Sequence, residues 1–196
     1  YIDDLKKLFS LMGVSYIHAD GEAEAYASEL CRIGYVDAVV TEDMDTLAYG
    51  CPVLIRSCID KSIKRPDAIT TFNFQKIIED LKLTHDEFID LCILCGCDYC
   101  PTIPKIGTVR ALKNIQEHKT IEKCLDLTTN PAPPEFLARY QVSRELFKVF
   151  KDKIDVDNLP ISSSEYNSAQ LYTYLVDECS MNKARVHSSL ARMRPT

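Results

Sequence analysis

The sequence predicts an α/β fold in which a parallel sheet is flanked by helices and followed by a purely helical half. Helical and strand patterns alternate over residues 1–56, and turn residues separate them. From residue 74 onward the apolar spacing is helical throughout. With 196 residues, of which 46% are hydrophobic, the chain can bury one sizeable core, or a core with a helical appendage.

The first elements follow from apolar spacing and from the glycines that end each pattern. Apolar residues recur at helical spacing from Ile2 to Met12, and Gly13 and Gly34 close two helices. The apolar run at 37–41 is typical of a buried strand. The expected elements are helices at 3–13, 22–33 and 44–49, and strands at 14–17, 37–41 and 53–56.

The second part of the chain carries only helical patterns and breaks between them. Thr84 and Glu87 form a capping box that opens a helix closing at Gly96. A hairpin at 102–111 is expected between two helices. The remaining expected features are helices at 74–81, 109–115, 135–151, 169–178 and 183–193, a proline-rich break at 130–134, and a polar linker at 160–164.

Five acidic residues lie at three places where one element should give way to the next. Two pairs come directly after a predicted strand, and the fifth follows the end of a helix. Because parallel strands end at the same edge of a sheet, we expect these side chains to lie close together. Carboxylate oxygens suit Mg²⁺ or Mn²⁺, whose natural substrates are phosphate esters. The five residues are Glu22, Glu24, Asp43, Asp45 and Asp98.

Each of these groups also has a simpler interpretation. The two glutamates fit the first turn of a helix, Asp43 fits an N-cap, and Asp98 fits a turn. It is their shared placement that favours a metal site. The hairpin at Ile106-Gly107 could present backbone N–H groups to a phosphate, with Lys105 and Arg110 adding charge, although a plain helix-to-helix turn would look the same.

Net charge and cysteine content narrow the classes of protein to which the chain could belong. A net charge of −6 argues against an indiscriminate nucleic-acid binder, although residues 183–194 are basic. No apolar run is long enough to span a membrane, and no signal peptide opens the chain, so its nine cysteines are expected to be reduced intracellular thiols. Four cysteines between Cys92 and Cys100 could be zinc ligands, but we favour small apolar side chains on a helix face.

The order of the motifs resembles the flap endonucleases, within the wider XPG-type family of structure-specific nucleases. The motifs are Gly-Glu-Ala-Glu-Ala at 21–25, Thr-Glu-Asp-Met-Asp at 41–45, Leu-Cys-Ile-Leu-Cys-Gly-Cys-Asp-Tyr-Cys at 91–100 and Ile-Gly-x-x-Arg-Ala at 106–111. The resemblance covers nearly the whole chain. It implies a PIN-like nuclease core at 1–98, a helix-hairpin-helix element that binds DNA at 99–126, and closing helices that pack on the core at 127–196.

The resemblance also implies an enzyme that cleaves 5′ flaps in DNA replication and repair, with 5′-exonuclease action, by two-metal catalysis with Mg²⁺ or Mn²⁺. The five carboxylates would hold both ions. Residues that would contact DNA are Glu22, Gly96, Asp98, Lys105, Gly107 and Arg110. An exonuclease or junction-resolving relative, and a non-catalytic scaffold of the same fold, remain alternatives.

Two departures from the family pattern matter. The hairpin usually reads Gly-Ile-Gly, whereas Lys105 stands at the first glycine, which affects the tight turn and any K⁺ bound by its carbonyls. The family's N-terminal portion is also missing before Tyr1, so we expect this chain alone to be weak or inactive. The resemblance further implies a nuclear location and a sliding clamp as a partner, through a segment outside these 196 residues.

Overall fold

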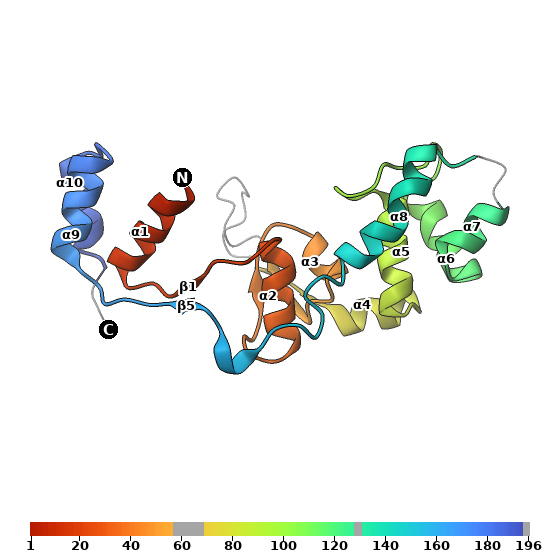
Figure 1. Cartoon of the computed structure of the whole chain (residues 1–196), viewed down its shortest axis with the longest axis horizontal. Helices are drawn as coiled ribbons and strands as arrows, with labels where there is room; N and C mark the ends of the chain where they lie inside the picture. Colours follow the sequence, from red (N-terminus) through yellow and green to blue (C-terminus); the bar gives the residue numbers. More distant parts are fainter. Residues whose placement is uncertain (57–68, 128–130, 194–196) are drawn as a thin grey trace. The chain divides into compact units, whose positions relative to one another are not determined.

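The computed structural model describes residues 1–56, 69–127 and 131–193 and divides into two compact units (Figure 1). Unit 1 joins the two ends of the chain, Tyr1–Ala19 and Asp157–Thr196. Unit 2 is the continuous stretch Asp20–Val156. All of the predicted site residues lie in unit 2.

Unit 1 is a helical group with a very short sheet. Helix α1 ends at Gly13, whose φ of 67° is left-handed and whose missing Cβ would lie 2.9 Å from the backbone nitrogen of Tyr166. Helix α1 packs against α9, and α9 against α10. The elements of unit 1 are α1 (Ile2–Met12), β1 (Tyr16–Ile17), β5 (Ile161–Ser162), α9 (Ser168–Thr173), the π-helix η2 (Tyr174–Glu178) and α10 (Lys183–Leu190), and the 3₁₀ helix η1 (Val156–Asn158) precedes β5.

The strand predicted at 14–17 does not join a parallel sheet. Strand β1 pairs antiparallel with β5, with Tyr16 opposite Ser162. Its partner lies in the segment that we expected to be a polar linker, where two strand residues carry no apolar alternation. The expectation that Glu22 and Glu24 follow a strand of the same sheet as Asp43 and Asp45 is therefore wrong.

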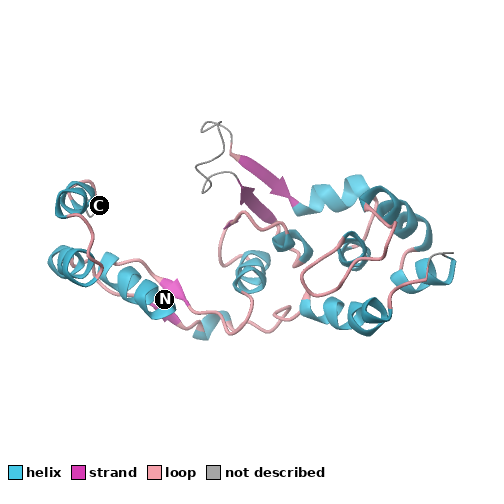
Figure 2. Ribbon diagram, turned by 90° about the horizontal axis from the view of Figure 1, so that it is seen from above, coloured by secondary structure: helices cyan, strands magenta, loops and turns pink. Residues whose placement is uncertain are grey.

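The sheet of unit 2 has the order β2–β3–β4, formed by β2 (Val39–Val40), β3 (Val53–Arg56) and β4 (Thr70–Asn73). Strands β2 and β3 are parallel, as predicted, whereas β4 runs antiparallel to β3 and was not predicted (Figure 2). The predicted burial of the strand at 37–41 holds for Val39, which is 7% exposed, but not for Val40, which is 48% exposed. The α/β class is confirmed, with a mixed sheet.

Helices enclose the core of unit 2. They are α2 (Ala23–Arg32), α3 (Asp45–Ala48), α4 (Phe74–Leu81), α5 (His85–Cys95), α6 (Thr108–His118), α7 (Ile121–Leu127) and α8 (Pro134–Leu146). Helix α5 packs against α6 and α8, and α6 against α7. Thr84 and Glu87 form the predicted capping box at α5. Helix α7 was not predicted, and α8 ends earlier than the expected Lys151.

The predicted boundaries at residues 98 and 126 both fall inside unit 2. Helices α5, α7 and α8 are joined across them, because Arg144 of α8 binds Asp90 of α5 and Glu122 of α7. The closing helices also separate, since α8 belongs to unit 2 whereas α9 and α10 belong to unit 1. The two compact units of the structure therefore have different boundaries from the segments inferred from the sequence motifs.

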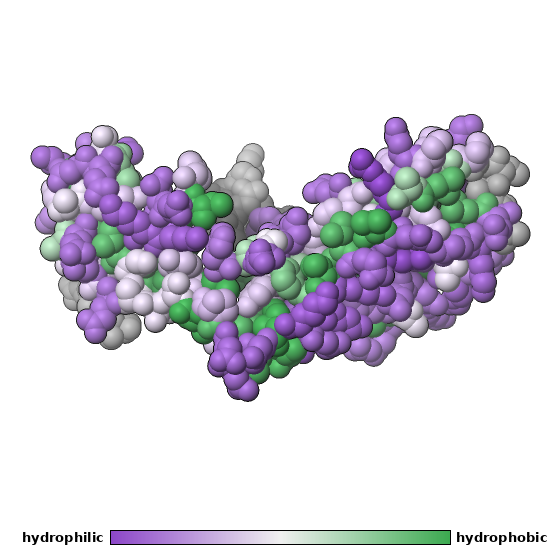
Figure 3. Space-filling model, in the orientation of Figure 1, coloured by the Kyte–Doolittle hydropathy of each residue, from purple (hydrophilic) through white to green (hydrophobic). Residues whose placement is uncertain are grey.

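Polar side chains dominate the visible face of the molecule, with hydrophobic residues gathered in smaller patches (Figure 3). Within the three described stretches, no helix is long and apolar enough to cross a membrane.

Candidate active site

The segment between β2 and α3 holds its two aspartates by hydrogen bonds within the loop. The backbone N–H of Asp43 donates to Thr41 Oγ1 at 3.1 Å, and the N–H of Asp45 donates to Asp43 Oδ1 at 2.9 Å. Asp45 is the first residue of α3, and its N-cap Met44 offers no side-chain bond. Asp43 therefore supplies the capping oxygen itself, and its second oxygen takes no part in this bond.

The third acidic segment is a sharp turn after α5. Gly96 ends the helix with φ 111°, a conformation that strongly favours glycine, and a Cβ there would lie 2.8 Å from the Thr102 methyl group. The next residues form a bridge between Cys97 and Cys100. Asp98 lies at this turn and is exposed. The turn therefore directs the chain past the helix end and leaves the carboxylate accessible.

Electrostatics show which carboxylates lie near one another. The pKa of Asp45 is raised, first by burial and then by the charges of Asp43, Asp98 and Glu22. Glu22 is the N-cap of α2 and exposed. Three of the other predicted carboxylates, from three separate segments of unit 2, therefore lie near enough to Asp45 for their charges to act on it.

Glu24 is the exception among the five. It is not among the charges that raise the pKa of Asp45, although it stands two residues from Glu22. It lies within α2, half-buried, and its carbonyl accepts a hydrogen bond from Ser28 at 2.6 Å. Glu24 follows the N-cap Glu22 by two residues and lies in the first turn of α2, so its role as a metal ligand stays a prediction.

The carboxylate oxygens of these residues are chemically suited to a divalent cation, but they do not form a closed set of ligands. In the described part of the chain, no group of three or more His, Cys, Asp or Glu side chains is placed to hold a metal ion. Mg²⁺, however, is usually held by one or two carboxylates together with water and substrate phosphate, not by a closed protein cage. Asp45, with the three carboxylates whose charges act on it, fits that mode of binding.

Two tyrosines that the sequence reasoning did not single out lie beside this acidic cluster. Tyr49 and Tyr99 share a hydrogen bond between their hydroxyl groups. Burial is the first cause that raises the pKa of each hydroxyl, and the charges of Glu22 and Asp45 raise both further. The sequence signal that could have indicated one of them is the position of Tyr99, directly after Asp98.

The hairpin at 102–111 keeps its tight turn despite the lysine. Lys105 adopts φ 66°, the left-handed region in which glycine is at ease and a lysine is strained. Ile103 and Ile106 on either side are buried and anchor the turn. The turn therefore survives the substitution at the cost of some backbone strain.

The basic side chains of the hairpin face a shallow hollow of about 540 Å³ at the start of α6. It is lined by Lys105, Gly107, Thr108, Val109, Arg110 and Lys113. Gly107 is the N-cap of α6 and provides no side-chain bond, so the first N–H groups of the helix have no capping partner from it. Val109, one of the residues lining the hollow, is 84% exposed.

The hairpin does not fit the K⁺ ion that the family pattern implied. Arg110 Nη1 donates to the carbonyl oxygen of Lys105 at 2.9 Å. A guanidinium charge thus lies at a carbonyl oxygen of the turn, and a second cation beside it would be repelled.

The cysteines between Cys92 and Cys100 behave as structural thiols. Burial raises the pKa of Cys92, Cys95, Cys97 and Cys100, as is typical of thiols that pack as small apolar side chains. Within the described residues they form no group placed to hold a metal ion.

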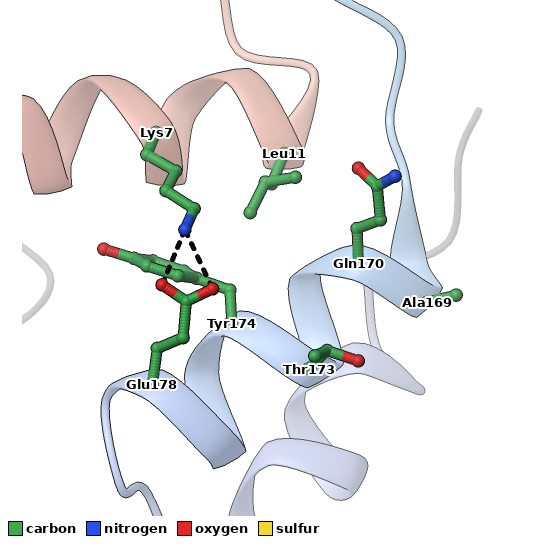
Figure 4. Close-up of a pocket in the computed structure, with 7 residues that line it drawn as sticks. All are labelled: Lys7, Leu11, Ala169, Gln170, Thr173, Tyr174 and Glu178. Carbon is green, nitrogen blue, oxygen red and sulfur yellow. Dashed lines mark hydrogen bonds and ion pairs between the residues drawn. The ribbon is translucent and has the colours of Figure 1, made fainter.

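A separate hollow of about 370 Å³ lies in unit 1 and has no acidic cluster (Figure 4). Lys7 Nζ points toward the carboxylate of Glu178, 2.6 Å from Oε2, and lies over the ring of Tyr174. Its charged groups satisfy one another, so this hollow is not a candidate for the chemistry of the acidic residues.

Comparisons with known proteins show what the chain is similar to. The XPG I-region family model matches residues 13–98. Flap endonuclease 1 of Glycine max is 40% identical over 195 residues, which cover 98% of this chain and 50% of that protein. The probable flap endonuclease 1 homolog of Danio rerio is also 40% identical, over 96% of this chain and 52% of its own length. The chain thus spans about half the length of these curated relatives.

Solved structures give the same assignment. Flap endonuclease-1 from Methanococcus jannaschii superposes with a TM-score of 0.77 at 28% identity, covering 98% of this chain and 56% of that one. The catalytic core of Rad2 in complex with DNA substrate gives a TM-score of 0.75 over 100% of this chain and 69% of its own, at 19% identity, which supports the fold alone. The region matched by the XPG I-region family model contains all five predicted carboxylates, and the chain is similar to flap endonucleases over nearly its whole length.

Proposed function

We propose that the protein containing this chain is a structure-specific DNA nuclease that cleaves 5′ flaps with the help of divalent metal ions, with 5′-exonuclease action as a related activity. The observation that carries the proposal is that the charges of Glu22, Asp43 and Asp98, from three segments of unit 2, act on the half-buried carboxylate of Asp45. An ionised carboxylate near three like charges is costly unless a cation offsets them.

The metal would supply an activated water molecule and would stabilise the charge that develops on the phosphate. The protein's own contribution is to position the carboxylates. The Thr41–Asp45 loop fixes the two aspartates by its internal hydrogen bonds, and the turn at Gly96 presents Asp98 beside them. We also propose that Glu22 and Asp98 contact the DNA strand that is cut, because both side chains are exposed.

The basic hollow at residues 105–113 would bind the phosphates of the duplex. Two lysines, an arginine and the free N-terminal turn of α6 are suited to phosphate oxygens and give no base specificity. Relatives support a DNA partner, since Rad2 was solved with DNA substrate and human GEN1 with Holliday junction DNA. We propose residues 99–126 as the DNA-gripping element on this basis.

The test is cleavage of a labelled 5′-flap substrate by the full-length protein during a Mg²⁺ titration. The variant Asp43→Asn/Asp45→Asn should lose cleavage by about 10²-fold or more, because charge stabilisation at the phosphate is lost. The matched control is Asp3→Asn/Asp4→Asn, which removes two charges from α1 and should cut normally. Equal cleavage by both double variants, or cleavage by the wild type in EDTA, would contradict the proposal.

A junction-resolving nuclease is the second candidate, because GEN1 proteins share the fold, one of them in complex with product DNA and Mg²⁺. Parallel assays on a flap, a blunt duplex and a four-way junction distinguish the three reactions. The sliding-clamp partner and the nuclear location implied by the family resemblance also remain proposals, which a clamp pull-down and localisation of the full-length protein would test.

A further inference from the structure

The hydroxyl groups of Tyr49 and Tyr99 form a hydrogen bond beside the acidic cluster. Tyr49 ends α3, and its backbone N–H donates to the carbonyl of Asp45 at 3.1 Å, one turn earlier. Tyr99 is the residue directly after Asp98. The hydrogen bond therefore joins the two segments that carry Asp45 and Asp98, which are far apart in sequence.

Both tyrosine rings rest on one buried side chain. The ring centroid of Phe147 lies 5.3 Å from that of Tyr49 and 5.4 Å from that of Tyr99, and Phe147 is 2% exposed. Tyr49 is itself 8% exposed. Two rings held against a common base leave the hydroxyl groups little freedom except toward each other.

Helix α3 packs against α5 through apolar side chains, but the hydrogen bonds of the two segments that bear the carboxylates are local. The loop before α3 is held by bonds within itself, and the turn after α5 is held by the contact between Cys97 and Cys100. Neither set of bonds crosses from one segment to the other. The tyrosine pair does cross, and it does so within a few residues of both Asp45 and Asp98.

We propose that the hydrogen bond between Tyr49 and Tyr99 is a positioning element that sets the spacing of the Asp45 and Asp98 carboxylates for the bound metal ions. The two tyrosines are positioning residues, because they act through the aspartates and not on the phosphate. This inference rests on the proposed function, since it assumes that the carboxylates bind metal.

The test measures Mn²⁺ binding to the full-length protein by calorimetry, together with thermal unfolding in EDTA. Tyr49→Phe and Tyr99→Phe keep both rings on Phe147 and remove only the hydroxyl bond. Each should weaken Mn²⁺ binding by ~3- to 10-fold, the effect expected from one net hydrogen bond. The double variant should be no weaker than either single variant, because each change already breaks the same bond. Tyr26→Phe, whose ring packs edge-on against Phe150, is the matched control and should bind as the wild type does.

A purely structural role would lower the unfolding temperature and leave Mn²⁺ affinity unchanged, and this result would overturn the inference. Additive losses in the double variant would also overturn it, since they would mean that the two hydroxyls act separately. The Asp43→Asn/Asp45→Asn variant separates the two proposals. If it binds Mn²⁺ like the wild type, the metal site and the positioning role both fail; if it loses binding while the tyrosine variants do not, only the positioning role fails.

Discussion

Replacing Arg144 with methionine should strongly destabilise unit 2. Its guanidinium binds Asp90 through Nε at 2.5 Å and Nη2 at 2.7 Å, and it binds Glu122 through Nη1 at 2.7 Å and Nη2 at 2.8 Å. It thereby joins α8 to α5 and α7. The substitution preserves most of the aliphatic volume and removes every one of these bonds.

The expected loss is set mainly by the Asp90 carboxylate, which is 3% exposed. Without Arg144 its remaining donor is the backbone N–H of Ile121 at 3.0 Å. Leaving a buried charge unpaired costs about 3–5 kcal/mol. Glu122 adds less than Asp90, because its side chain is 43% exposed and water can solvate part of its charge. Since domains are stable by about 5–15 kcal/mol, unit 2 should be left marginally folded.

Urea unfolding followed by circular dichroism measures this loss. Arg139→Met removes an exposed arginine from the same helix and is the control, with an expected change within about 0.5 kcal/mol. The double variant Asp90→Asn/Arg144→Met should recover part of the loss, because it removes the unpaired charge and keeps an acceptor for the N–H of Ile121. A loss below about 1 kcal/mol in Arg144→Met, or no recovery in the double variant, would refute the reasoning.

Three further outcomes are expected. Gly96→Ala should destabilise the protein by about 1–3 kcal/mol in urea unfolding, because of its positive φ and the nearby threonine methyl group, whereas Gly107→Ala, with no heavy atom within 4 Å of its Cβ, should be tolerated. Duplex affinity should change by less than about twofold when KCl is replaced with NaCl at equal ionic strength, because Arg110 already occupies the carbonyl of Lys105; a strong preference for K⁺ would contradict this. Hydrogen bonding by its arginine partner lowers the pKa of Glu122 from 4.5 to about 2, so its contribution to stability should be complete above pH 4.5 and lost as the pH falls toward 2; a Glu122→Gln variant whose urea midpoint falls as steeply as that of the wild type would argue against it.

Local signals in the sequence predicted local structure well. The capping box at Thr84 fixed the start of α5, and apolar spacing gave α4 its observed bounds, Phe74–Leu81. Both signals are contained within one element, so no distant partner is needed to form them. Gly13 likewise ended α1 as predicted, because only its left-handed φ was required.

Pairings between distant segments could not be predicted in the same way. Strand β1 has two residues, and its partner at Ile161–Ser162 lies in a polar stretch without alternation. The site shows the same limit. The sequence indicated that acidic segments gather, but it gave no means of finding the hydroxyl contact of Tyr49, because that contact depends on how α3 is rotated in the fold.

Unit 1 has a consequence for the order in which the chain acquires structure during synthesis. Its ion pair between Lys7 and Glu178 joins residues 171 positions apart in sequence, whereas unit 2 is a single continuous stretch. Residues Tyr1–Ala19 emerge from the ribosome long before residues Asp157–Thr196 are synthesised. Unit 2 can therefore complete its own contacts while Tyr1–Ala19 still waits for the chain beyond residue 156, and a nascent chain stalled before that point would leave the apolar face of α1 uncovered by α9.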